Sequence, residues 1–103
     1  MTIRIYVTMV TWNPAKAAAN LAKHGVSFEE AISVFADPNS ETTEDTAHSV
    51  IEPRWLLLGY STGNRVLVIA YTVRRINGIE TIRIISARPA NRRERSTAAR
   101  QRD

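Results

Sequence analysis

Arginine is the residue type in this sequence that is best suited to chemistry on an anion, and five arginines lie between Arg83 and Arg95. The guanidinium group donates paired hydrogen bonds that match the oxygens of a phosphate. Residues 54–103 contain eleven basic residues, all arginine, and three acidic ones, whereas residues 1–53 contain three basic and seven acidic residues. The cationic half favours a polyanionic partner, nucleic acid first and an acidic protein second. A solvated surface without a partner is the alternative.

Other side chains that could transfer a proton are few. The chain has two histidines, His24 and His48, and no cysteine, which excludes a thiolate nucleophile and a disulfide. His24 falls at the end of a predicted helix, where histidine commonly bonds the last carbonyl groups, so a structural role competes with a role in a site. Half of the ten acidic residues lie between Asp37 and Glu52 without the spacing of metal ligands. We therefore predict neither a metal site nor a cofactor.

The elements that must position these groups are indicated by hydrophobic periodicity and by capping residues. Apolar and polar residues alternate up to Trp12, which predicts a half-buried strand over most of the first twelve residues. Asn13 and Pro14 predict the start of a helix that ends at His24, because Gly25 is a typical helix C-cap.

A second helix is predicted from the capping box that Ser27 and Glu30 can form. Asp37-Pro38 ends it, and the acidic segment up to Glu52 is predicted to be a loop with a short strand near residues 42–44. No apolar run approaches the roughly 18 residues of a membrane helix, and the N-terminus lacks the apolar run of a signal peptide. Export and membrane insertion are not expected, which leaves the cytoplasm as the default location.

Three strands follow, at about residues 54–61, 65–74 and 79–88, and the hairpin signals Gly63-Asn64 and Asn77-Gly78 join them. They predict an antiparallel meander. Together with the N-terminal strand and the two helices, the meander predicts one small α+β domain spanning residues 1–103.

Two-residue turns at both joints would fix the register and divide the side chains between two faces. The more apolar face, expected under the two helices, carries Arg54, Leu56, Leu58, Tyr60, Leu67, Ile69, Tyr71, Ile82, Ile84, Ser86 and Arg88. The other, partly open face is predicted to group Arg74, Thr72, Arg83 and Trp55. Arginines beside an aromatic ring on rigid strands suit the gripping of phosphates and the stacking of a base.

The last helix is predicted to begin at Pro89 and to be basic. Its only apolar residues are Ala90, Ala98 and Ala99, too few for independent stability. It therefore needs a polyanion or a protein partner, and the alternative is a frayed tail beyond Ser96.

Two blocks of residues resemble a known family. The front block contains Trp12, Lys16, Asn20, Lys23-His24-Gly25, Phe28 and Ala31, and the back block contains Ile85-Ser86-Ala87-Arg88, Ala90, Arg92, Glu94 and Arg95. Over about Trp12 to Arg95 the chain is similar to the BrnT family of bacterial toxins, the ribonucleases of BrnT/BrnA type II toxin–antitoxin modules. Met1 to Thr8 extend beyond the family's usual start.

The resemblance implies a RelE-like fold, metal-independent cleavage of RNA, on the ribosome or free of it, and inhibition of growth. It also implies neutralisation by a BrnA-like antitoxin with a ribbon-helix-helix DNA-binding domain, through which alone the toxin would reach operator DNA.

Metal-free RNA cleavage needs a group that accepts the 2′-hydroxyl proton, cations that stabilise the phosphate in the transition state, and an acid for the leaving oxygen. The catalytic candidates are Arg83, Arg74, Arg88, His24 and Tyr71, and the RNA-binding candidates are Arg54, Arg65, Trp55, Lys23 and Arg92. For Arg88 a salt bridge to Glu52 or Glu94 competes with phosphate contact. Without a histidine in place, arginines would do most of the work and Tyr71 or Lys23 would transfer the proton.

Two other classes of protein share these features. A noncatalytic RNA- or ribosome-binding module would bind RNA and leave it intact. A degenerate toxin would dock its antitoxin and cause no growth arrest.

Overall fold

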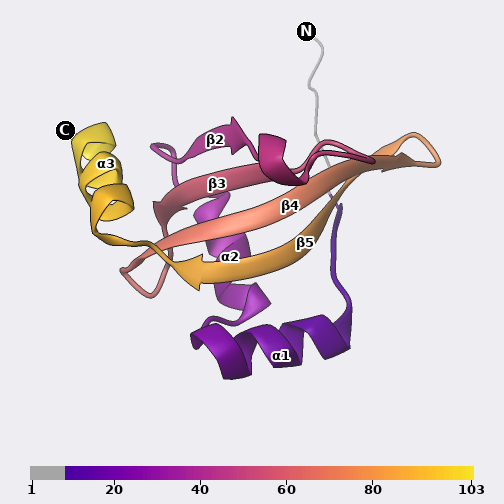
Figure 1. Ribbon diagram of the computed structural model, residues 1–103, viewed down its shortest axis with the longest axis horizontal. Helices are drawn as coiled ribbons and strands as arrows, with labels where there is room; N and C mark the ends of the chain where they lie inside the picture. The colour runs from indigo at the N-terminus through magenta and orange to yellow at the C-terminus, as the bar shows by residue number, and fades with distance from the viewer. Residues whose placement is uncertain (1–8) are drawn as a thin grey trace, which may run out of the picture.

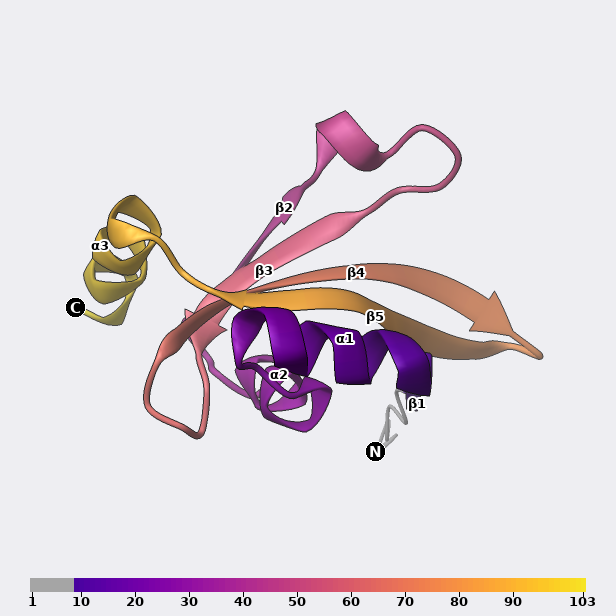
Figure 2. The same ribbon diagram turned by 60° about the horizontal axis from the view of Figure 1, so that its bottom comes forward.

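A five-stranded sheet organises the protein, with two helices against one face and a third helix at one end of the other (Figures 1 and 2). The structure is a computed structural model and describes residues 9–103. Its elements are β1 Met9–Thr11, α1 Pro14–His24, α2 Phe28–Val34, β2 Glu41–Glu44, the 3₁₀ turn η1 Thr46–His48, β3 Trp55–Tyr60, β4 Val66–Ile76, β5 Ile79–Pro89 and α3 Arg92–Arg102.

The strand order is β1-β5-β4-β3-β2. Three of the four strand pairings are antiparallel, whereas β1 runs parallel to β5, so the sheet is mixed rather than purely antiparallel. The predicted α+β class is confirmed, and the predicted strand residues before Met9 lie outside the described residues. Within residues 9–103, no helix is long and apolar enough to span a membrane.

Short side chains fix the ends of α1 and α2 as predicted. The Asn13 side chain accepts hydrogen bonds from two amides of the first turn of α1, and Gly25 ends the helix with a φ of 68°. The Ser27 hydroxyl caps α2 by accepting from the Glu30 amide at 3.0 Å. The predicted capping box is only half formed, because the Glu30 carboxylate binds Arg65 instead of turning back to Ser27.

The hairpin between β4 and β5 has the predicted register. Asn77 and Gly78 both have positive φ angles, 51° and 77°, as a two-residue turn of the primed type requires. Thr72 consequently lies opposite Arg83.

The hairpin between β3 and β4 differs from the prediction by one residue. Positive φ falls on Asn64 alone, at 58°, and this residue closes a three-residue loop rather than sharing a two-residue turn with Gly63. Trp55 therefore lies opposite Tyr71, and the shift turns every side chain of β3 to the other face. The predicted grouping of Trp55 with Arg74 is wrong, since Trp55 packs against the helix-side core.

A bulge in β5 moves the last residues of that strand as well. Tyr71 lies opposite Ile84 but Ala70 lies opposite Ser86, so Ile85 is an extra residue that reverses the alternation beyond it. Arg88 lies opposite Val68 and shares its face, and its predicted place on the helix-covered face is wrong.

The helix-covered face, here called the covered face, holds the main core. Its buried residues are Val26, Phe28, Ala31, Val34, Leu57, Leu67, Ile69, Tyr71, Ile84 and Ala87. Asn20 joins α1 to the edge of β5 inside this core: its amide nitrogen donates to Ala87 O at 2.8 Å and to Val26 O at 2.9 Å, and its oxygen accepts from Ala87 N at 3.1 Å. Asn20 thus satisfies the Ala87 peptide groups beyond the short pairing with β1.

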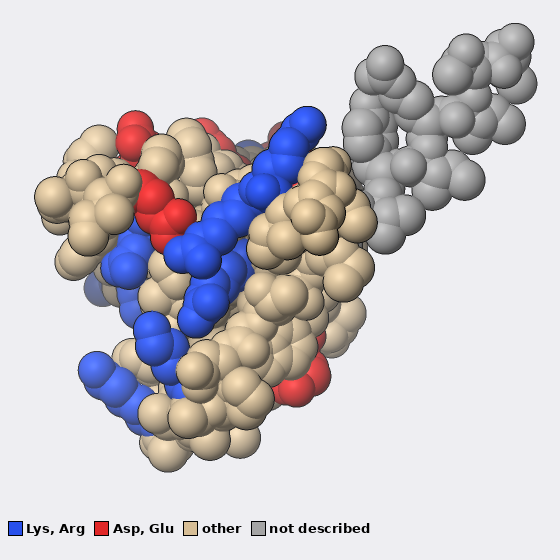
Figure 3. All heavy atoms as spheres, turned by 90° about the vertical axis from the view of Figure 1, so that its right-hand side faces the viewer, with Lys and Arg blue, Asp and Glu red and all other residues tan. Residues whose placement is uncertain are grey.

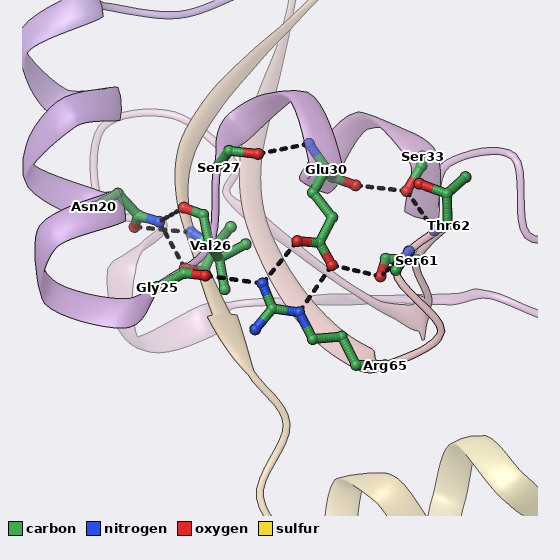
Figure 4. Close-up of polar contacts among 11 residues, drawn as sticks. Asn20, Gly25, Val26, Ser27, Glu30, Ser33, Ser61, Thr62 and Arg65 are labelled. Carbon is green, nitrogen blue, oxygen red and sulfur yellow. Dashed lines mark hydrogen bonds and ion pairs between the residues drawn. The ribbon is translucent and has the colours of Figure 1, made fainter.

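A second polar network ties α2 to the β3–β4 loop (Figure 4). Arg65 donates two hydrogen bonds to the Glu30 carboxylate, at 2.7 and 2.8 Å, and a third to Gly25 O at 2.8 Å. The Ser61 hydroxyl donates to the same carboxylate at 2.6 Å. The Arg65 hydrogen bonds, opposed by desolvation and aided by Ser61, lower the pKa of Glu30 from 4.5 to about 2.

This network predicts a specific acid sensitivity. Because the pKa of Glu30 is depressed in the folded state, its ion pair stabilises the fold above about pH 4.5, and that stability is lost as the pH falls towards 2. The Arg65 side chain is 41% exposed, so we discount the effect for solvent screening to about 1–2 kcal/mol. Urea unfolding between pH 6 and 2.5 measures it. Glu30→Gln should be less stable at pH 6 and lose less stability on acidification, and parallel pH profiles would contradict the assignment.

The last helix, α3, is anchored at both ends. Asn91 and Glu94 form a complete capping box, which starts the helix at Arg92 rather than at the predicted Pro89. Ala90 and Ala98 pack with Val66, Val68, Leu56, Leu58 and Tyr60 in a second apolar cluster. The guanidinium of Arg102 lies 3.4 Å from the centroid of the Tyr60 ring. The helix therefore continues past Ser96 instead of fraying there.

Candidate nucleic-acid interface

Three arginines surround one threonine on the sheet face opposite α1 and α2, here called the open face. Thr72 lies in β4 with Arg83 beside it on β5, and Arg74 follows two residues later on the same face. The pairing of Trp55 with Tyr71 places Arg54, the residue before β3, on the other side of Thr72. We call Arg54, Arg74 and Arg83 the arginine cluster. Figure 3 shows basic side chains gathered in a band across one side of the molecule.

A carboxylate from a distant loop binds this cluster. Arg74 donates to both oxygens of Glu52, from Nη2 at 2.8 Å and from Nε at 3.2 Å. These hydrogen bonds outweigh desolvation and, with the charges of Arg74, Arg83 and Arg54, lower the pKa of the Glu52 carboxyl. All three guanidinium groups therefore act electrostatically on one anion.

The loop that carries Glu52 is closed at its base. Residues 45–54, here called the arm, form a loop in which Asp45 N donates to Arg54 O at 2.7 Å and the Ser49 hydroxyl accepts from Arg54 N at 2.9 Å. Within the arm, His48 Nδ1 lies 2.9 and 3.1 Å from the carboxylate oxygens of Asp45. The bonds at the base fix where the arm leaves the sheet, and His48 and Glu52 both belong to this loop.

Arg88 is also paired with a carboxylate. Its two terminal nitrogens donate to the two oxygens of Glu94 at 2.8 and 3.0 Å, which joins β5 to the first turn of α3. The Arg88 hydrogen bonds lower the pKa of Glu94 in spite of partial desolvation. Of the two carboxylates proposed from sequence, Glu94 is therefore the partner of Arg88, and Glu52 pairs with Arg74.

The remaining candidates lie away from the arginine cluster. Tyr71 is buried on the covered face, where its ring packs edge-on against Phe35 and its hydroxyl lies 3.3 Å from Thr42 Oγ1. Lys23 and His24 end α1 on the same side of the sheet. The sheet separates all of them from the open face.

The two remaining RNA-binding candidates differ from each other. The guanidinium of Arg65 is held by the polar network described above, and Arg92 is an exposed residue at the start of α3. Between residues 9 and 103, no group of three acidic or histidine side chains is arranged to hold a metal ion.

A sheet covered on one face and cationic on the other defines the chain as a small α+β protein with an arginine-lined surface. The chain belongs to the BrnT family. The family model described as the ribonuclease toxin BrnT of a type II toxin–antitoxin system matches residues 12–94 of the sequence. The crystal structure of the Brucella abortus ribonuclease toxin BrnT has the same fold, with a TM-score of 0.59 and 18% identity over 82% of this chain and 97% of that one. No curated protein matches the sequence.

Proposed function

We propose that this toxin cleaves RNA at the arginine cluster without a metal ion and thereby inhibits translation and growth. The observation that carries the proposal is the placement of Arg54, Arg74 and Arg83 around Thr72, where Arg74 already binds a carboxylate, that of Glu52, through two hydrogen bonds. A surface that concentrates three guanidinium groups around one anion can stabilise the extra negative charge of a phosphodiester in its transition state.

The nucleophile is the 2′-hydroxyl of the substrate, and its proton needs an acceptor. We assign this role to His48, because its imidazole lies on the arm that also carries Glu52. The Asp45 carboxylate accepts from Nδ1 at 2.9 Å, which favours the tautomer whose Nε2 can take up a proton. The depressed pKa of Glu52 makes this carboxylate a poor base, and Tyr71, Lys23 and His24 lie across the sheet.

We propose the remaining properties from family membership. The partner is a BrnA-like antitoxin with a ribbon-helix-helix domain, which alone brings the complex to operator DNA. The toxin is one RelE-like domain over residues 1–103 and acts in the cytoplasm, where its RNA substrate and the ribosome are found.

Expression with and without the adjacent antitoxin gene tests the function in cells. We expect growth arrest and loss of RNA only when the antitoxin is absent, and relief of both by Arg83→Ala. Unchanged growth in every combination would rule out a toxin. Arginine-dependent binding of RNA that stays intact would show a binding module rather than a ribonuclease.

A further inference from the structure

We infer that the arginine cluster and Thr72 together form a binding site for one phosphodiester group of RNA, which the carboxylate of Glu52 occupies in the free protein. The inference rests on the proposed function for its choice of RNA as the source of the phosphate. In this site the Thr72 hydroxyl is a further hydrogen-bond donor, and the Glu52 carboxylate competes with the RNA phosphate.

The hydroxyl of Thr72 is the first independent observation. The residue is 3% exposed, and its Oγ1 has no hydrogen-bond partner among residues 9–103. Buried polar atoms nearly always have a partner, so an unpartnered one indicates an acceptor that is not part of the sheet. Neighbouring strands lie about 4.8 Å apart, so Thr72 and the arginines on either side of it can reach one tetrahedral anion.

The geometry of Glu52 is the second observation. Its two oxygens receive the two donors of Arg74 in the forked arrangement that guanidinium groups also use for phosphate. The carboxylate therefore stands where a phosphate would bind, and Arg54 and Arg83 flank the neighbouring Thr72 on the same face.

Glu52 can leave this site without disturbing the sheet. Its side chain and that of Arg74 are 40% and 49% exposed, and exposed ion pairs are weak. Because Glu52 comes from the arm and not from a strand, its withdrawal breaks no strand pairing. An RNA phosphate in its place would interact with the three guanidinium groups and accept a hydrogen bond from the Thr72 hydroxyl.

Binding of a short 2′-O-methyl RNA tests this directly, since such an RNA lacks the nucleophile and stays intact. We expect Glu52→Gln to tighten binding about threefold, because the competing anion is lost. Glu44→Gln is the matched control, because it removes the same charge from the other face of the sheet. Glu44 is exposed on β2 and lies opposite Trp55, thus on the covered face. The control should change affinity less than about 1.5-fold, through screened charge alone. Equal effects of the two variants would overturn the inference.

Thr72→Val provides a second test, because it removes the hydroxyl and keeps the branched shape. RNA affinity should fall about tenfold, since a hydrogen bond to a charged phosphate is lost. The midpoint of thermal unfolding should not fall, because the hydroxyl bonds no described residue. Unchanged affinity, or a lower midpoint, would overturn the inference.

The two proposals can fail separately. If wild-type protein leaves RNA intact but Glu52→Gln still tightens binding, the phosphate site stands and the ribonuclease assignment falls. If RNA is cut but both variants bind like wild type, only the phosphate site falls. If Glu52→Gln binds polyglutamate more tightly but not RNA, the ligand of the site is an acidic protein and not RNA.

Discussion

Arg83→Ala is expected to lower kcat/KM for RNA cleavage by about 10²- to 10³-fold, the usual cost of removing one donor that stabilises transition-state charge. Arg83 lies beside Thr72 on the open face, and its charge is among the causes that lower the pKa of Glu52. Initial cleavage rates on an end-labelled RNA measure the loss. The variant should keep its fold, because Arg83 projects from a strand into a partly solvated surface.

Arg75→Ala is the matched control for this substitution. Arg75 follows Arg74 in β4, is exposed, and lies opposite Glu80 on the other side of the hairpin. The control removes the same charge from β4, the strand paired with β5, but from the face that does not carry the cluster. Equal losses in the two variants would show that only net charge matters and would contradict a site on the open face.

Asn20→Ala is expected to lower the free energy of unfolding by about 3–5 kcal/mol, since three hydrogen bonds to buried backbone groups are lost together. The amide and carbonyl of Ala87 would lose their bonds to α1, and the carbonyl of Val26 would lose one as well. Urea denaturation measures the change.

Asn13→Ala serves as the control for helix capping, because it removes the side chain that caps the same helix in an exposed position. It should cost about 1 kcal/mol. A cost for Asn20→Ala no larger than that of the cap would contradict the assigned role of Asn20.

Much of the candidate site could be predicted from sequence because it depends on a single turn. Asn77-Gly78 fixes the register between β4 and β5, and that register alone brings Thr72 opposite Arg83. The ends of α1 at Asn13 and Gly25 could be predicted equally well, because a capping residue bonds only the first or last turn of its own helix.

The two wrong assignments of side chains to a face of the sheet came from features that leave only a weak signal in the local sequence. The loop that ends at Asn64 is one residue longer than a two-residue turn, and the bulge at Ile85 has no glycine or proline to mark it. Each reversed the face of the residues beyond it, which moved Trp55 to the covered face and Arg88 to the open one. Local patterns do not report such changes in register.

Contacts between residues far apart in the sequence could not be predicted either. Arg74 and Glu52 lie 22 residues apart, and their pairing depends on how the arm folds back over the sheet. The roles of Asn20 and Arg65 likewise depend on partners 67 and 35 residues away. Charge and periodicity indicated which residues could contact a phosphate, but not which carboxylate already bound them.

The most direct measurement of metal-independent cleavage at the arginine cluster compares an RNA with its 2′-deoxy counterpart, in EDTA, using wild-type protein and Arg83→Ala. We expect wild type to cut only the RNA, to leave 2′,3′-cyclic phosphate and 5′-hydroxyl ends, and to be unaffected by EDTA, whereas Arg83→Ala should be nearly inactive. Cleavage of the deoxy strand, loss of activity in EDTA, or full activity of Arg83→Ala would contradict this mechanism.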